Sequence, residues 1–154
     1  MSSNFVQRGG LWVLRQGVLL LAVIVCGVIW RHQWQCLPVL LCGALLLLTA
    51  AVCGIAGTIA LGRNLTPFPQ PSSTTQLVQT GIYGLIRHPL YTAVICGSLG
   101  WALVWQSGPA LAAALVLVPF FDAKARREEQ WLQQRFPEYT SYAERVKRFL
   151  PWVY

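Results

Sequence analysis

Residues 37–61 read LPVLLCGALLLLTAAVCGIAGTIAL, an apolar run without a single charged side chain. A helix that crosses the hydrocarbon core of a bilayer needs roughly 20 apolar residues, within a range of about 17–25. The run therefore predicts a membrane-spanning helix. Three further stretches fit the same description, the last two at or below the short end of the range. The four predicted spans are 11–30, 37–61, 90–106 and 109–123.

The overall composition agrees with a membrane protein. Of the 154 residues, 55% are hydrophobic and 11% are charged, and the mean hydropathy is +0.51. A soluble domain of this size needs far more charge to cover its surface. We therefore predict one all-α integral membrane domain over residues 1–154. The net charge of +7 is explained by basic residues at membrane edges, so we expect no nucleic-acid partner.

The five cysteines show no CxxC or CxxH spacing, and four of them lie within apolar runs. Cysteine acts there as a small hydrophobic residue. We expect neither a metal site nor a disulfide framework.

The distribution of basic residues predicts the orientation. With four spans, the N-terminus, the loop 62–89 and the tail 124–154 share one side of the membrane. Eleven of the twelve basic residues belong to that side, and the opposite side holds only Arg31. By the positive-inside rule both termini are cytoplasmic; in a bacterium the membrane would be the inner one. The eleven residues are Arg8, Arg15, Arg63, Arg87, Lys124, Arg126, Arg127, Arg135, Arg145, Lys147 and Arg148.

The tail is predicted to be helical and to gather the polar chemistry. The helix of the fourth span is expected to continue through residues 122–136, and Pro137 can start a second helix. There Tyr139, Tyr142, Val146 and Phe149 recur at near-helical spacing. They predict an amphipathic helix that lies on the membrane or on the protein.

The first candidate site is GIYGLIRHPLYTA, residues 81–93, at the entrance of the third span. Pro89 fits the first turn of a helix and His88 its cap, and a helix N-terminus attracts anions. Arg87 adds a planar donor fork, and Tyr83 and Tyr91 each add a ring and a hydroxyl. The alternative is that these side chains only anchor the end of a span at the interface.

The second candidate site is KARREEQWL, residues 124–132. Glu128 and Glu129 can accept hydrogen bonds from an ammonium group or from ribose hydroxyls. The alternative is a solvated helix with ion pairs such as Asp122 with Arg126. Taken together, the two clusters predict one pocket with a cationic and an acidic wall, which suits a zwitterionic ligand.

These motifs occur in an ordered pattern from about Leu61 to Pro151: LGRNLTPFPQP, LVQTGIYGLIRHPLYTA and ARREEQWLQQRFPEYTSYAERVKRFLP. In this order they resemble the isoprenylcysteine carboxyl methyltransferase family, which is grouped with phospholipid N-methyltransferases. The sequence departs from that pattern at Ile82 and Gly84, where relatives commonly carry a proline and an arginine.

The resemblance implies that the chain binds S-adenosylmethionine and methylates a lipid-like small-molecule acceptor at the cytoplasmic face of the membrane. It implies catalytic roles for Arg87 and His88. The cofactor-binding residues that it implies are Tyr83, Arg87, His88, Pro89, Tyr91, Arg126, Glu128, Glu129, Tyr139 and Tyr142. No GxGxxG loop follows a strand, so a Rossmann-type methyltransferase is excluded.

The sequence leaves the acceptor open. A carboxylate acceptor needs no base, and Arg87 could orient it. An amine acceptor needs a base, for which His88 or a glutamate is the candidate. The alternative from another class is a non-catalytic membrane protein that binds a lipid or a partner with the same fold.

Overall fold

The computed structural model describes residues 9–68 and 76–154, so Arg8 and part of the predicted loop 62–89 lie outside the described residues. Within those ranges every regular element is a helix, and one isolated bridge joins Ile86 to Lys147. The α-helices are α2 (Gly10–Ile29), α3 (Leu37–Leu61), α4 (Pro89–Val104), α5 (Gly108–Arg135) and α6 (Tyr139–Arg145). The short 3-10 helices are η1 (Gly62–Asn64) and η2 (Gly81–Gly84).

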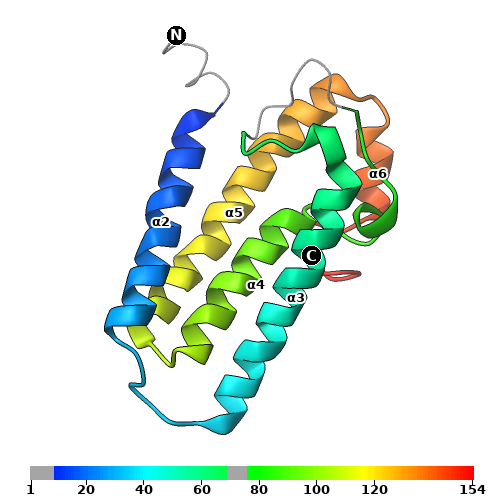
Figure 1. Cartoon of the computed structure of the whole chain (residues 1–154). Helices are drawn as coiled ribbons and strands as arrows, with labels where there is room; N and C mark the ends of the chain where they lie inside the picture. The colour runs from blue at the N-terminus through cyan, green and yellow to red at the C-terminus, as the bar shows by residue number, and fades with distance from the viewer. Residues whose placement is uncertain (1–8, 69–75) are drawn as a thin grey trace.

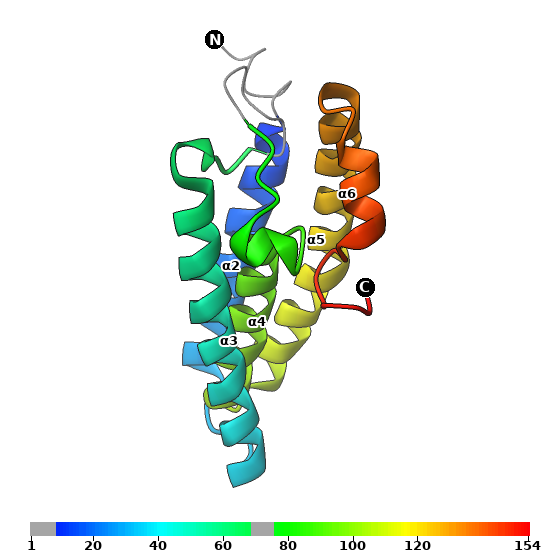
Figure 2. The same cartoon turned by 90° about the vertical axis from the view of Figure 1, so that its right-hand side faces the viewer.

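Four helices run side by side as a bundle, and α6 lies against the protruding end of α5 (Figures 1 and 2). Three stretches are long and apolar enough to cross a membrane: α2, α3 with η1, and α5. The remaining helix of the bundle, α4, is apolar but only 16 residues long. The predicted all-α membrane fold is confirmed. The observed helices begin and end within two residues of the first three predicted spans.

The outer faces of the bundle are apolar and exposed, as on Leu21, Leu45 and Ile59. In water such surfaces would be unstable, whereas in a bilayer lipid tails cover them. The inner faces bury small residues between α3 and α4. A Cβ atom on Gly100 of α4 would lie 2.8 Å from the carbonyl oxygen of Gly43 in α3. Only glycine allows this approach, which fixes α4 against α3.

The fourth predicted span is the membrane part of α5, which continues for another three turns to Arg135, as expected. Ser107 is the N-cap of the helix, and its hydroxyl accepts a hydrogen bond from the amide of Ala110 (3.4 Å). It passes through Pro119 without ending. Its extension beyond the predicted span therefore carries Glu128 and Glu129.

The predicted tail helix is wrong beyond Arg145. Tyr139 and Tyr142 lie on α6 and are buried against the protein, but Val146 is extended. The reason is that the chain before α4 has amide groups that need acceptors. Carbonyl oxygens of the extended tail supply them, which helical geometry would not allow.

Candidate functional site

Two segments meet at the entrance of α4: the residues that directly precede this helix and the extended tail after Arg145. Pro89 is the first residue of α4 and His88 is its N-cap. The amide of Arg87 donates to the carbonyl oxygen of Lys147 (2.8 Å), and the amide of His88 donates to that of Arg148 (3.1 Å). The extended tail is therefore fixed directly across the RHP motif.

Glu129 is the centre of a buried ionic cluster at this junction. Its Oε1 accepts from Arg87 Nη2 (3.0 Å) and lies 3.0 Å from His88 Nε2. Arg148 Nη2 donates to its Oε2 (2.7 Å), and the Glu129 side chain is only 9% exposed. This hydrogen bond to Glu129 raises the pKa of Arg148. The cluster joins α4, α5 and the tail through a single carboxylate.

Arg87 is almost fully engaged by this cluster and by the backbone. Its Nε and Nη2 both donate to Glu129, and its Nη1 donates to the carbonyl oxygens of Ala143 (2.8 Å) and Val146. A guanidinium has five N–H groups, so these four bonds leave one N–H for other contacts. Arg87 therefore holds the tail in place.

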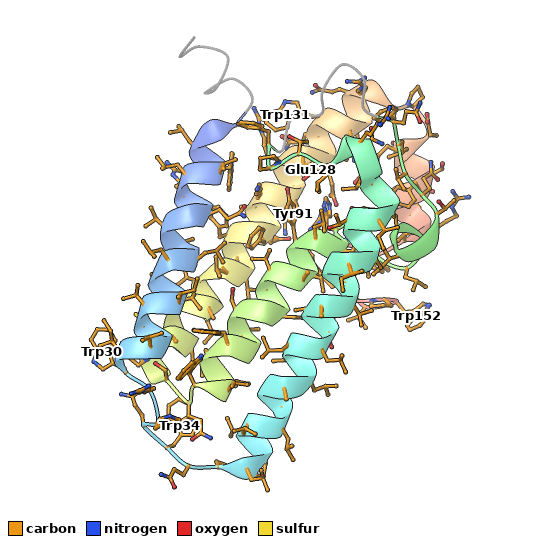
Figure 3. All side chains as sticks on the ribbon, in the orientation of Figure 1. Trp30, Trp34, Tyr91, Glu128, Trp131 and Trp152 are labelled. Atoms are coloured by element: carbon orange, nitrogen blue, oxygen red, sulfur yellow. The ribbon has the colours of Figure 1, made fainter. Side chains whose placement is uncertain are left out.

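Glu128 points in a different direction from Glu129, because adjacent residues on a helix do not share a face. Its Oε2 accepts from the hydroxyl of Tyr91. The ring of Tyr91 is stacked on that of His88, with centroids 5.2 Å apart. Figure 3 shows Tyr91 and Glu128 close together between α4 and the upper part of α5.

A cavity of about 770 Å³, its open mouth included, lies between the entrance of α4, the extension of α5 and α6. Six of its lining residues are apolar: Leu61, Phe68, Leu77, Val78, Leu90 and Leu132. The remaining lining is polar or aromatic and contains Asn64, Thr66, Gln76, Tyr83, Arg87, His88, Tyr91, Glu128, Tyr139 and Tyr142.

Two tyrosines of α6 differ in how their hydroxyls are satisfied. The hydroxyl of Tyr142 donates to the carbonyl oxygen of Tyr83 (2.6 Å). The hydroxyl of Tyr139 is buried and has no hydrogen-bond partner among the described residues. Burial raises the pKa of Tyr142 to about 12 and raises that of Tyr139 further. Both phenols are therefore neutral at ordinary pH, and Tyr139 has a proton to donate to a ligand.

Seven of the ten residues expected to bind a cofactor line this cavity. The other three are Pro89, Arg126 and Glu129. Pro89 packs below the cavity, close to Gly57 of α3. Arg126 is exposed and binds Asp122 (2.7 Å) and the hydroxyl of Tyr154 (3.1 Å). For all ten residues the assignment to the cofactor stays a prediction.

Sequence reasoning missed several residues of the site. The sequence indicates no role for Arg148 beyond that of a basic residue of the tail, and none of its own for Lys124, which is 2% exposed, within KARREEQWL. Asn64 and Thr66 line the cavity from the loop 62–89, in which we predict no site residue before Tyr83. The signal for these two was their place in LGRNLTPFPQP, which belongs to the pattern that carries the resemblance.

The family model for phospholipid methyltransferases matches residues 39–139, a region that includes both motifs. The chain belongs to the phospholipid methyltransferase family. Outside the match lie residues 1–38, which include all of α2, and residues 140–154, the tail after Tyr139.

Similar proteins bear different names. The nickel-cobalt-cadmium resistance protein NccN of Alcaligenes xylosoxydans xylosoxydans is 31% identical over 94% of this chain and 65% of its own length. Protein-S-isoprenylcysteine O-methyltransferase A of Arabidopsis thaliana is 33% identical over 72% of this chain and 58% of its own length. The chain thus spans less than two thirds of these relatives.

The fold has a solved counterpart. A structure of the eukaryotic intramembrane Ras methyltransferase ICMT (isoprenylcysteine carboxyl methyltransferase) superimposes with a TM-score of 0.71. It is 22% identical and covers 90% of this chain and 53% of that chain. The resemblance of this phospholipid methyltransferase family member to the isoprenylcysteine enzymes is therefore confirmed for the family and the fold.

Proposed function

We propose that this protein is a methyltransferase that binds S-adenosylmethionine in the cavity and methylates an acceptor dissolved in the membrane. The observation that supports this most directly is the buried hydroxyl of Tyr139. An unpartnered buried hydroxyl costs about 1–3 kcal/mol. A ligand that accepts its hydrogen bond would remove that cost, and Glu128 offers a carboxylate in the same cavity.

The residues present fit such a cofactor. Small-molecule sites usually combine apolar and aromatic side chains with a few polar groups, as the lining of this cavity does. Glu128 would accept hydrogen bonds from hydroxyl or ammonium groups, and Tyr139 would donate one. When bound, the cofactor supplies an electrophilic methyl group on a sulfonium. The apolar lining residues, among them Leu61, Leu90 and Leu132, suit the lipid-like part of an acceptor.

The chain itself contributes alignment and exclusion of water, which are the main needs of a methyl transfer. The ionic cluster around Glu129 fixes the RHP motif, so that His88 and Tyr91 present one stacked surface to the cavity. Arg87 and His88 then act by keeping the walls of the site at fixed positions relative to one another. The site would face the cytoplasm, because the basic loop and tail surround it.

The lining favours an amine acceptor over a carboxylate. The guanidinium of Arg87 is occupied by Glu129 and by two carbonyl oxygens, so little of it is free to hold an acceptor carboxylate. Glu128, in contrast, faces the cavity and can bind an ammonium group and accept its proton. The amine nitrogen would then take the methyl group as the sulfonium leaves as a thioether.

Equilibrium binding of radiolabelled S-adenosylmethionine to the purified protein in detergent tests the proposal. Glu128→Gln removes a charged acceptor, and Tyr139→Phe removes the free donor. We expect each variant to lose affinity about tenfold or more. Glu144→Gln, an exposed carboxylate of α6, is the control and should bind like the wild type. Unchanged binding in both cavity variants would rule out this assignment.

The second candidate function is that of a non-catalytic membrane protein. The name of one relative, a resistance protein, favours this candidate. Membranes incubated with the methyl-labelled cofactor separate the two candidates. Labelled lipid on thin-layer analysis would identify an amine acceptor, and base-labile label would identify a methyl ester. Cofactor binding without any labelled product would favour the non-catalytic protein.

A further inference from the structure

The end of the tail forms a closed loop whose shape is set by its own backbone. The amides of Phe149 and Leu150 both donate to the carbonyl oxygen of Tyr154, at 2.7 and 2.8 Å. The amide of Val153 donates back to the carbonyl oxygen of Leu150 (3.2 Å). Trp152, at the turn, has a φ of 62°, which is uncommon for a bulky residue. We call residues 149–154 the tail loop.

The tip of the tail loop is apolar and almost free of protein contacts. Trp152 is 87% exposed, Val153 is 74% exposed and Leu150 is 55% exposed. The strained turn therefore presents a tryptophan outward and does not bury it. Such a tip would be unfavourable in water, whereas tryptophan is the residue most typical of a membrane interface.

The base of the tail loop is fixed at the level where α5 leaves the membrane. The hydroxyl of Tyr154 donates to Asp122 (2.9 Å) and accepts from Arg126 (3.1 Å). These two residues flank position 123, where the predicted span ends. On the same face of α5, one and two turns deeper, lie Val118 and Leu115, both exposed. The apolar tip is thus continuous with the lipid-facing side of the bundle.

The position of Trp152 agrees with this level. Figure 3 shows Trp152 projecting from the side of the bundle, nearer than Trp131 to the end that carries Trp30 and Trp34. Trp131 lies on the extension of α5 beyond the membrane. The tail loop therefore reaches back from the extension toward the bilayer.

We propose that the tail loop is a membrane anchor, in which Leu150, Trp152 and Val153 insert among the lipids at the cytoplasmic interface. Its occupant is the bilayer and not a protein partner. The anchor is joined directly to the cavity wall. Thr92 Oγ1 lies 3.3 Å from the carbonyl oxygen of Phe149, and the Phe149 ring packs on that of His88 at 6.0 Å. Insertion thus holds the tail across the entrance of α4 by a contact with lipid.

Cysteine accessibility in lipid nanodiscs that hold one copy of the full chain tests this proposal. A charged, membrane-impermeant maleimide reaches both faces of a nanodisc but not thiols among the lipids. Trp152→Cys and Val153→Cys place the thiol at the tip, where the replaced side chains touch little of the protein. Glu144→Cys places it on the exposed face of α6 as the control. The wild type gives the background of the five native cysteines.

We expect Glu144→Cys to take up more label than the wild type. The two tip variants should lose this extra labelling and match the wild type until the protein is unfolded in denaturing detergent. Labelling of both tip variants at the rate of Glu144→Cys would overturn the anchor. Protection that appears only in nanodiscs with two copies would also overturn it, because a second chain would then cover the tip. The result does not depend on cofactor binding or methyl transfer.

Discussion

Glu129 shows at the residue scale why the second glutamate of the EE pair differs from the first. It contacts Arg87, His88 and Arg148, whereas Glu128 faces the cavity. Two largely buried guanidinium groups share this carboxylate; Arg148 also pairs with Asp122 (2.8 Å), whereas the ion pair of Arg87 is with Glu129. Removing one member of such a buried group leaves uncompensated charge, which is far more costly than the group's net contribution.

We therefore predict that Glu129→Gln destabilises the protein by about 3–5 kcal/mol. The amide retains one acceptor, but its NH2 group faces the donors of Arg87 and Arg148. Thermal unfolding of the purified protein in detergent measures the effect. Glu144→Gln, the same change at an exposed site, should stay within about 0.5 kcal/mol of the wild type. Equal melting of the two variants would mean that Glu129 is not the centre of the cluster.

At the scale of elements, the position of α4 decides the geometry of the site. α4 carries His88 at its cap and Tyr91 in its first turn, and it packs on α3 through glycine contacts. A side chain at Gly100 would meet the backbone of α3, which cannot rotate away as a side chain could. Displacing α4 would therefore disturb the cavity at the other end of the helix.

Gly100→Val is predicted to destabilise the protein by about 1–3 kcal/mol through overpacking. The matched control is Gly17→Val on α2, where an added Cβ has nothing within 4 Å. Thermal unfolding in the same detergent compares the two, and circular dichroism checks that helix content is kept. A Gly17→Val loss as large as that of Gly100→Val would point to helix propensity and not to packing.

At the scale of the whole molecule, local signals predicted the spans but not the contacts that close the site. The bounds of α3 match the run 37–61 because membrane thickness sets the length of an apolar helix. The bond from Arg87 to Glu129 joins residues 42 apart, and that from Arg148 joins residues 19 apart. No periodic pattern encodes such pairs. The prediction of a tail helix beyond Arg145 was wrong for the same reason. The amides of Arg87 and His88, distant in sequence, donate to the carbonyl oxygens of Lys147 and Arg148.

The orientation of the bundle is a prediction that only the whole molecule can carry. The structure brings the cavity, the extension of α5 and the tail to one end of the bundle, and the connection after Trp30 to the other (Figures 1 and 3). Among the described residues the basic side chains follow this division, with Arg31 next to the connection at the far end. Because basic residues are retained on the cytoplasmic side, the cavity end should be cytoplasmic.

Reporter fusions in a bacterial host test that orientation. Alkaline phosphatase, which is active only outside the cytoplasm, should be inactive when fused after Tyr154 and active when fused after Trp34. A fluorescent protein that folds only in the cytoplasm should give the reverse pattern. The fusion after Trp34 also serves as a control. It includes only α2 and its flanking charges, so it reports the orientation of that helix alone. If both reporters reversed, the water-soluble cofactor would have to enter from the outer side, and the proposed reaction would lose its supply.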